Sequence, residues 1–485
     1  MSLKRNFIYN TLYQIFMILL PIITVPYVSR ILGPDGVGLY SYTGSYAQYF
    51  LIFGMIGISL YGNRQVAYTK NNKKQLSREF WNIYALQFIT TNISFITYII
   101  IFVFINNNNN VLYLVQSIVI FATIFDISWF FIGYEDMKSV VIRNTIVKVL
   151  GVLSIFIFIK QPSDVIKYTF IMTISNLIGQ VIMWFNLKNK VNLYKPKIKE
   201  ALVHLKPSLA LFISQLSIQI YTLLDKSMLG AMAGVYEVGI YENSQKTIKL
   251  ALTLITSLGV VMLPRMSALH SEGRKEEFNT LIYKAFNFVN FMAFPMVFGL
   301  IAVSNSFSVW FYGEAFEGIG FLLKVGSILM LFIGWSNILG IQVMLPIKKE
   351  KQFTISVTIG AIVNLILNLF LIKNFQAVGT TLSSVIAELS VTVAQLYFLK
   401  DIVNIVDILK TTLKPLIGSF IMSIVLLFVI PLFGVGVIWT FIEIVIGGLV
   451  YLLIMFVLKD SFLYEGLKLI KRKYGEKRRI FYEKI

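Results

Sequence analysis

Polar and charged side chains recur at helical spacing inside a strongly apolar stretch of this chain, residues 207–232. Steps of four, three and four residues place Gln215, Gln219, Thr222 and Lys226 on one helix face, with Asp225 on the adjoining strip. A charge at membrane depth costs about 2.5–3.5 kcal/mol even on the gentler insertion scales. Such residues therefore predict a functional role, which for a lysine includes binding an anion.

A second apolar stretch, residues 238–263, repeats the pattern. Its polar face carries Glu242, Lys246, Lys249, Thr253 and Thr256. Two stripes of this kind on neighbouring helices predict the lining of a shared polar cavity, in which the lysines could balance an anionic group. The alternative is structural ion pairing, of Asp225 with Lys226 or a neighbour and of Glu242 with Lys246.

Other charges in apolar segments leave their roles open. Arg30 either adds positive charge to the same cavity or extends to the lipid headgroups. Asp126, Glu388 and Glu443 are each a site of proton or cation coupling, a structural hydrogen-bond partner or a residue at a helix boundary.

The composition indicates a membrane protein. Of the 485 residues 57% are hydrophobic and 14% are charged, against about a quarter charged in soluble domains. No cysteine is present, which excludes disulfides, and His204 and His270 are expected to be solvated in polar connections, so no metal site is predicted. The absence of a P-loop or a Gly-rich nucleotide motif predicts no cofactor and no ATP hydrolysis by this chain.

Fourteen segments are apolar enough for the roughly 20 residues that a membrane helix needs. The basic N-terminus is interpreted as the start of the first one and not as a signal peptide. The predicted segments are 7–30, 38–62, 81–105, 111–133, 140–160, 166–186, 207–232, 238–263, 285–309, 321–345, 353–373, 378–400, 415–434 and 438–458.

Basic residues are distributed unevenly between the two sides of this arrangement. With the N-terminus in the cytoplasm, 35 of the 43 Lys and Arg fall in cytoplasmic connections and tails. The positive-inside rule then places both termini in the cytoplasm, and the net charge of +19 is explained by topology and anionic lipid, not by nucleic acid. The basic tail, residues 459–485, is expected to lie on anionic lipid.

The connection between the first two segments resembles the one between the seventh and eighth. "RILGPDGVGLYS" and "SMLGAMAGVYEVGIYE" both contain Leu-Gly followed by Val-Gly-x-Tyr, and an offset of 201 residues relates Gly38 to Gly239 and Tyr40 to Tyr241. The same offset relates Gln48 to Lys249, so the second half has a cation where the first is neutral. The repeat predicts two pseudo-symmetric six-helix lobes around a central cavity, followed by two extra helices.

Five passages in order along the chain resemble the polysaccharide flippases, the Wzx type, of the multidrug/oligosaccharidyl-lipid/polysaccharide (MOP) exporter superfamily. They are "RILGPDGVGLYS", "FDISWFFIGYEDMK", "KPSLALFISQLSIQIYTLLDKSMLG", "YENSQKTIKLALTLITSLGVVMLPRMSAL" and "NLILNLFLIKNFQAVGTTLSSVIAE". The resemblance implies alternating-access transport of a polyprenyl-(pyro)phosphate-linked glycan to the outer leaflet of a bacterial plasma membrane, for capsule or teichoic acid assembly. H⁺, Na⁺ or the membrane potential would supply the energy.

The expected organisation follows from the helix pattern and this resemblance. The chain is expected to act as a monomer, with other polysaccharide assembly proteins as potential partners. Two alternatives stay open: a peptidoglycan lipid precursor flippase of the same superfamily, and a polysaccharide polymerase or ligase, which needs a larger outer loop than this chain has. The predicted parts are an N-lobe (1–190), a cytoplasmic linker (191–206), a C-lobe (207–400), a helix pair forming a lipid-tail groove (401–458) and the basic tail (459–485).

Overall fold

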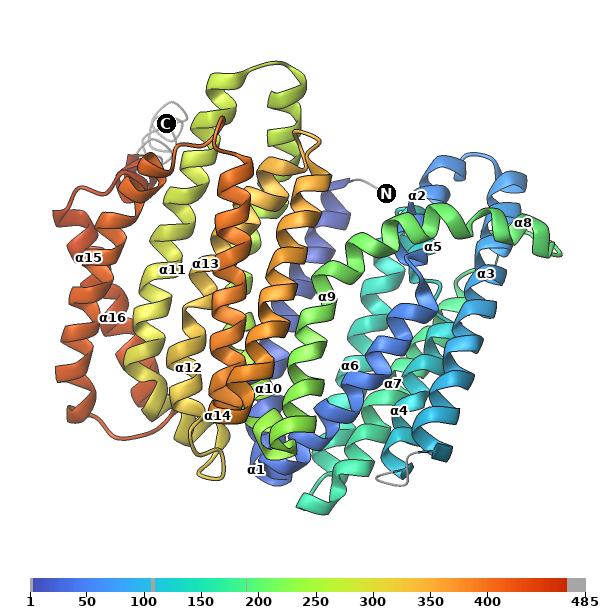
Figure 1. Ribbon diagram of the computed structural model, residues 1–485, viewed down its shortest axis with the longest axis horizontal. Coiled ribbons are helices and arrows are strands. Elements are labelled where there is room, and N and C mark those ends of the chain that lie inside the picture. The colour runs from blue at the N-terminus through green and yellow to red at the C-terminus, as the bar shows by residue number, and fades with distance from the viewer. Residues whose placement is uncertain (1–2, 106–109, 189, 469–485) are drawn as a thin grey trace, which may run out of the picture. The chain divides into compact units, whose positions relative to one another are not determined.

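The computed structural model describes residues 3–105, 110–188 and 190–468, apart from the side chains of residues 3–18, 137, 213–215, 217, 218, 221, 258, 260 and 261. These described residues form helices and connections and contain no β-strand (Figure 1). The chain divides into two compact units, Met1–Glu242 and Asn243–Ile485. The division falls inside one long helix, α10 (Val235–Ser271).

Among the described residues, unit 1 contains α1 to α9, the short segments η1 and η2, and the beginning of α10. The helices are α1 (Leu3–Met55), α2 (Ile58–Thr69), α3 (Lys73–Ile99) with its π-helical extension η1 (Ile100–Ile105), α4 (Asn110–Ile124), α5 (Ser128–Gly133), α6 (Met137–Phe158), the short η2 (Pro162–Asp164), α7 (Val165–Phe185), α8 (Ile198–Val203) and α9 (Leu205–Ala233).

Unit 2 contains the rest of α10 and the helices that follow. They are α11 (Lys275–Tyr312), α12 (Ile319–Ser327), α13 (Leu329–Ser336), the π-helical η3 (Asn337–Met344), α14 (Glu350–Phe398), α15 (Ile405–Val429), the short η4 (Ile430–Leu432) and α16 (Val437–Val457).

All fourteen apolar segments coincide with helix, and two pairs of them share one helix. The segments 7–30 and 38–62 both begin on α1, which changes direction at Gly33, and the segments 353–373 and 378–400 both lie on α14, which changes direction at Gln376. Gly33 has φ 67° and Gln376 has φ 49°, values that lie outside the right-handed helix. Ten helices in the described part of the chain are long and apolar enough to cross a membrane.

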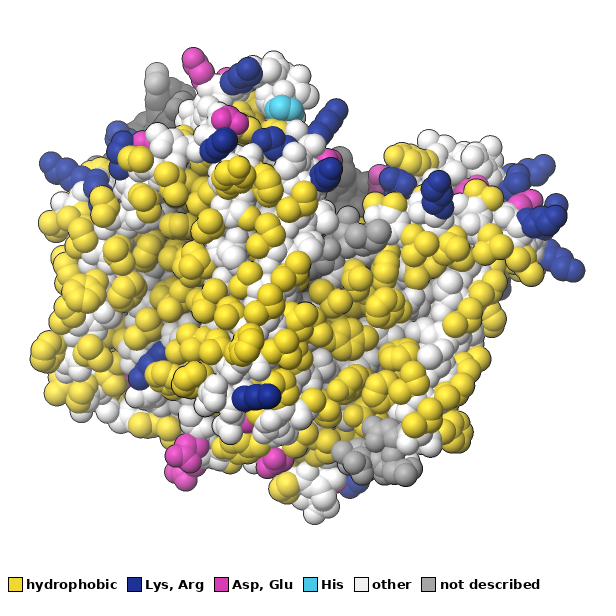
Figure 2. All heavy atoms as spheres, in the orientation of Figure 1, with side chains coloured by type: hydrophobic (Ala, Val, Ile, Leu, Met, Phe, Trp, Pro, Cys, Tyr) yellow, Lys and Arg dark blue, Asp and Glu magenta, His cyan; other side chains and the backbone are white. Residues whose placement is uncertain are grey.

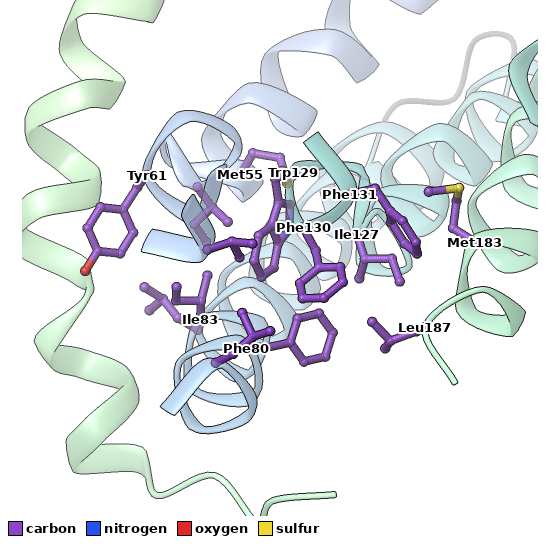
Figure 3. Packing of buried hydrophobic residues seen from close by; sticks show 14 of the residues in the cluster. Met55, Tyr61, Phe80, Ile83, Ile127, Trp129, Phe130, Phe131, Met183 and Leu187 are labelled. Carbon is purple, nitrogen blue, oxygen red and sulfur yellow. The ribbon is translucent and has the colours of Figure 1, made fainter. Parts of the chain in front are cut away.

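The passage "FDISWFFIGYEDMK" forms the centre of the hydrophobic core of unit 1 (Figure 3). Trp129 is buried against Phe80 and Gly62, and a methyl group on Gly62 would lie 2.5 Å from the indole ring. The indole Nε1 donates a hydrogen bond of 2.9 Å to Gln87, whose amide donates in turn to the carbonyl oxygens of Thr123 and Asp126. This passage therefore holds α2, α3 and α5 together.

The connection between α7 and α9 is tied to α2 and α3 by polar contacts. Glu200 accepts hydrogen bonds from Tyr194, Asn82 and Arg78 at 2.8, 3.0 and 3.1 Å. These donors, Tyr194 first, lower the pKa of Glu200 to about 2.

His204 differs from its sequence-based expectation. It is buried, not solvated, and its Nδ1 lies 2.8 Å from the Tyr61 hydroxyl. The reason is that α8 ends at His204 and α9 begins directly after it, so the junction packs against α2.

Hydrophobic side chains cover most of the helix surface visible in Figure 2. They include the outward faces of α15 and α16, where Phe428, Phe441 and Leu453 are exposed. Large exposed apolar surfaces of this kind are typical of helices that face lipid.

Candidate functional site

The two repeated connections cross each other inside unit 1. A methyl group on Gly38 would lie 1.7 Å from the carbonyl oxygen of Val235, and a methyl group on Gly239 would lie 2.0 Å from that of Pro34. The same offset of 201 residues relates Gly38 to Gly239 and Pro34 to Val235. The two contacts are therefore equivalent, and each glycine permits a backbone approach that a side chain would block.

A second pair of glycines starts the two crossing helices. Gly33 has φ 67° and ψ 178°, and Gly234 has φ 96° and ψ 169°, so both occupy a region that disfavours other residues. They too are 201 residues apart. The Leu-Gly pair noted in the sequence, at Leu229 and Gly230, is thus not the structural counterpart of Leu32 and Gly33. The equivalent glycine lies four residues later.

An ion pair joins α9 to the first turns of α10. Lys226 Nζ lies 2.6 Å from Glu242 Oε2, and the two side chains keep 21% and 13% of their surface exposed. This contact connects the polar stripe of α9 to that of α10 within unit 1. A pair so largely removed from solvent leaves a poorly compensated charge when one partner is deleted.

Asp225 has a different partner from its sequence neighbour. Its side chain is 1% exposed and accepts a hydrogen bond of 2.7 Å from the Tyr241 hydroxyl. Tyr241 is the tyrosine of the second repeat, and its counterpart Tyr40 packs edge-on against Tyr168 at 5.0 Å. Two adjacent charged residues of α9 therefore contact two adjacent residues of α10.

Tyrosines of α1 complete the contacts of α9. The ring of Tyr42 covers Gly230, where a methyl group would lie 2.1 Å from Cδ2, and the Tyr49 hydroxyl lies 3.0 Å from that of Ser227. Ser227 and Gly230 follow Lys226 by one and four positions along α9. The ion pair thus sits beside a close packing of α1 on α9.

The remaining cavity candidates differ in exposure within their own units. Lys246 is half-buried, whereas Arg30, Gln48, Gln219 and Lys249 are exposed. The side chain of Gln215 lies outside the described residues. The binding roles of all these residues stay predictions from the sequence.

The acidic candidates have hydrogen-bond partners of their own. Asp126 accepts from the backbone N–H of Ser128 at 2.9 Å, which starts α5. Glu388 and Glu443 are buried and accept hydrogen bonds of 3.4 Å from the hydroxyls of Ser336 and Ser306. Across the residues that the structure describes, no group of three or more His, Cys, Asp or Glu side chains could hold a metal ion.

Arg143 is a buried cation that counting charges by connection assigns to the cytoplasmic surface. It lies on α6, is 8% exposed, and its guanidinium donates to Gln180 Oε1 at 2.7 Å. Gly179, beside Gln180 on α7, would place a methyl group 3.8 Å from Arg143 Cδ. Its assignment to a cytoplasmic connection hid it in the sequence, although its position inside the segment 140–160 was a usable signal.

The family model described as "Polysaccharide biosynthesis protein" matches residues 3–270, more than half of the chain. The chain belongs to this family. The matched part includes the crossing, the ion pair and the lysines of α10. Membership in the polysaccharide biosynthesis protein family confirms the resemblance seen in the sequence, and with the apolar helices it identifies a multi-pass membrane protein.

Two relatives of this family member are matched over nearly their whole length. It is 25% identical to a candidate O-antigen transporter of Escherichia coli K12 over 408 residues, 83% of this chain and 97% of that one. It is 21% identical to the capsular polysaccharide biosynthesis protein CapF of Staphylococcus aureus, over 82% of this chain and 99% of that one. The family and these relatives separate the chain from the polymerase and ligase enzymes.

A solved structure shares the fold. The inward closed conformation of the lipid II flippase MurJ superposes with a TM-score of 0.70, at 20% identity, covering 94% of this chain and 99% of that one. The all-helical membrane fold expected from the sequence is therefore confirmed at the level of the fold class.

Proposed function

We propose that this protein is a flippase that moves a polyprenyl-(pyro)phosphate-linked glycan from the inner to the outer leaflet of a bacterial plasma membrane by alternating access. The observation that carries the proposal is the set of lysines on membrane helices α9 and α10 of a polysaccharide biosynthesis family member. A phosphate-bearing head crossing a low-dielectric region needs compensating cations along its path. Lys226, Lys246 and Lys249, with Arg30, meet this need.

The ion pair gives one of these cations a second role. Lys226 lies 2.6 Å from Glu242, so it also holds α9 against α10. Lys246 and Lys249 are assigned to the anionic head, with Arg30 and the polar Gln48, Gln215 and Gln219 along the same path. Arg143 supplies a further buried cation in unit 1.

The proposed architecture has fourteen membrane crossings, both termini in the cytoplasm and two lobes, residues 1–190 and 207–400, around the cavity. Splitting α1 at Gly33 and α14 at Gln376 supports this number, because each half is then long enough for one crossing. Helices α15 and α16 follow the lobes and are assigned the groove for the polyprenyl tail. An ion gradient or the membrane potential, with no cofactor, drives transport by a monomer. Asp225, Glu242, Asp126 and Glu388 are the carboxylates to test for ion coupling.

Capsule or teichoic acid assembly is favoured over a role in peptidoglycan synthesis. The candidate O-antigen transporter and CapF are matched over 97% and 99% of their lengths. The lipid II flippase MurJ of Bacillus subtilis is matched at 26% identity but over only 27% of its length, and the solved MurJ structure, at 20% identity, supports the fold alone.

Export of polysaccharide in the native host tests the proposal. Deleting the gene should abolish the surface polymer and accumulate its lipid-linked precursor inside the cell, and the wild-type chain should restore export. Lys246→Ala/Lys249→Ala at normal membrane levels should restore less than about a tenth of it, as expected for two lost charge-assisted contacts. Full restoration by this double variant would contradict the assignment of these lysines, and an unchanged precursor pool in the deletion strain would contradict the function itself.

A further inference from the structure

The connection between α7 and α9 presents large apolar side chains outward. Ala201 and His204 of α8 and its junction are buried, and Glu200 is tied to α3. On the outer side Ile198, Leu202 and Val203 are 68%, 50% and 70% exposed, and Leu193 just before the helix is 93% exposed. A helix facing water shows the opposite arrangement, so the outer side of this connection faces something other than water.

Lysines border these apolar side chains. Lys195, Lys197 and Lys199 are exposed and lie between them along the chain. A mixture of exposed aliphatic side chains and lysines is what the headgroup region of an anionic bilayer accepts, because the aliphatic groups enter the acyl boundary while the ammonium groups meet phosphate. We name Leu193, Ile198, Leu202, Val203, Lys195, Lys197 and Lys199 together the linker face.

An aromatic cluster places this connection at the level of a membrane–water boundary. Trp81 Nε1 donates a hydrogen bond of 3.0 Å to the carbonyl oxygen of Asn192, and the Trp81 ring packs against Trp184 and Tyr84 at 6.2 and 6.0 Å. Tryptophan and tyrosine concentrate at that boundary in membrane proteins. Figure 1 shows α8 beside the end of α3, and Figure 2 shows Lys and Arg side chains gathered there above a hydrophobic surface.

From these observations we infer that the linker face is inserted into the headgroup region of the anionic leaflet and is a lipid-anchoring surface. The anchored connection leads directly into α9, which carries Asp225 and Lys226. Lipid contact at the linker face therefore fixes the depth at which α9 begins. The inference needs only the membrane location of the protein and not the proposed function.

The lack of native cysteines makes a direct test simple. Ile198→Cys in the full chain is labelled with the environment-sensitive fluorophore NBD and placed in nanodiscs of phosphatidylcholine with phosphatidylglycerol. Lys275→Cys, at an exposed polar position that begins α11, is the matched control. The label at residue 198 should emit at shorter wavelength and be quenched at least about twofold more strongly by lipid bearing a doxyl group near its headgroup.

A charge variant separates the basic part of the anchor from the apolar part. Adding Lys195→Gln, Lys197→Gln and Lys199→Gln should reduce doxyl quenching about twofold in discs containing phosphatidylglycerol and change it little in phosphatidylcholine alone. Leu202→Cys repeats the measurement if the label at residue 198 disturbs α8. Iodide quenching as strong at residues 198 and 202 as at 275 would overturn the inference. Shielding from iodide in native membranes, but not in nanodiscs, would also overturn it and would indicate a protein partner instead.

Discussion

Lys226 and Glu242 form an ion pair of 2.6 Å between the last turns of α9 and the first turns of α10. One residue earlier, the Asp225 carboxylate accepts a hydrogen bond from Tyr241, one residue before Glu242. Two consecutive residues on one helix thus bind two consecutive residues on the next. These paired contacts stabilise the connection through Gly234 beside the crossing of the two repeats.

Removing one partner of the Lys226–Glu242 ion pair should destabilise the fold more than removing both. Lys226→Ala should lower the free energy of unfolding by about 2 kcal/mol. This value lies between the small loss expected for an exposed ion pair and the loss of several kcal/mol expected when one partner of a buried pair is removed. Lys226→Ala/Glu242→Ala should recover part of that loss, because no carboxylate is left without its lysine. Thermal unfolding of the purified variants in detergent measures this. A double variant less stable than the two single losses combined would contradict the pairing.

Even substitution by alanine should be poorly tolerated at the two crossing glycines, Gly38 and Gly239. The obstacle for Gly38→Ala is the backbone carbonyl of Val235, which cannot rotate away like a side chain, so the cost should reach at least about 3 kcal/mol, the upper end of the overpacking range. Gly239→Ala should behave the same way against Pro34.

Gly448→Ala is the matched control for the crossing, because nothing lies within 4 Å of a methyl group at this position of α16. It should be neutral or stabilising by up to about 1 kcal/mol, the difference in helix propensity. Melting temperatures and surface export of all three variants give the comparison. Wild-type stability of both Gly38→Ala and Gly239→Ala would rule out the crossing as described.

The positions of the helices could be predicted from the sequence because membrane helices are long, apolar and bounded by charged connections. The repeat was also visible, in Gly38, Tyr40, Gly239 and Tyr241. The changes of direction were harder to locate. Helix is present directly before and directly after Gly33 and Gln376. In place of the polar connections predicted there, the chain has single residues with non-helical backbone angles.

The buried tryptophan of the core should be far more important for stability than an exposed one. Trp129→Ala should cost about 3–5 kcal/mol, because it leaves a cavity beside Phe80 and removes the donor to Gln87. Trp439→Ala, at a 39% exposed position that begins α16, is the control and should cost under about 1.5 kcal/mol. Unfolding of the two variants in the same detergent checks this difference. Equal losses would show that Trp129 is not central to the core.

Acid should weaken the attachment of the α7–α9 connection. The pKa of Glu200 is about 2 in the folded protein, held down by Tyr194, Asn82 and Arg78, against an ordinary value of 4.5. The stabilisation that the Glu200 carboxylate contributes is therefore complete above pH 4.5, the pKa of the group in the unfolded chain. It is lost as the pH falls from 4.5 toward 2.

A substitution isolates the contribution of this carboxylate. Glu200→Gln should be less stable than the wild type near neutral pH, and the difference should shrink as the pH falls through that window. Glu276→Gln, an exposed residue in the first turn of α11, controls for the loss of one negative charge. Melting curves over a pH series measure both variants. A difference for Glu200→Gln that stays constant with pH would contradict the role of its charge.

The partners of individual charges could not be predicted from the sequence. Helical spacing correctly suggested that Lys226 and Glu242 belong to polar faces, but spacing within one helix cannot show that these faces meet. Counting basic residues by connection assigned Arg143 to the surface, and the polar surroundings of His204 suggested solvent; both are buried through contacts with neighbouring helices. Such contacts depend on tertiary packing, which periodicity does not encode.

Transport by the purified protein in a defined membrane is the direct test of the flippase assignment. The full chain is placed in proteoliposomes with a fluorescent polyprenyl-pyrophosphate-linked oligosaccharide, and a membrane-impermeant quencher reports its movement between leaflets. We expect that the wild-type chain moves this lipid, that movement needs an ion gradient or membrane potential, and that Lys246→Ala/Lys249→Ala slows it at least about tenfold. No movement by the well-folded wild-type chain, or equal movement by the double variant, would contradict this expectation.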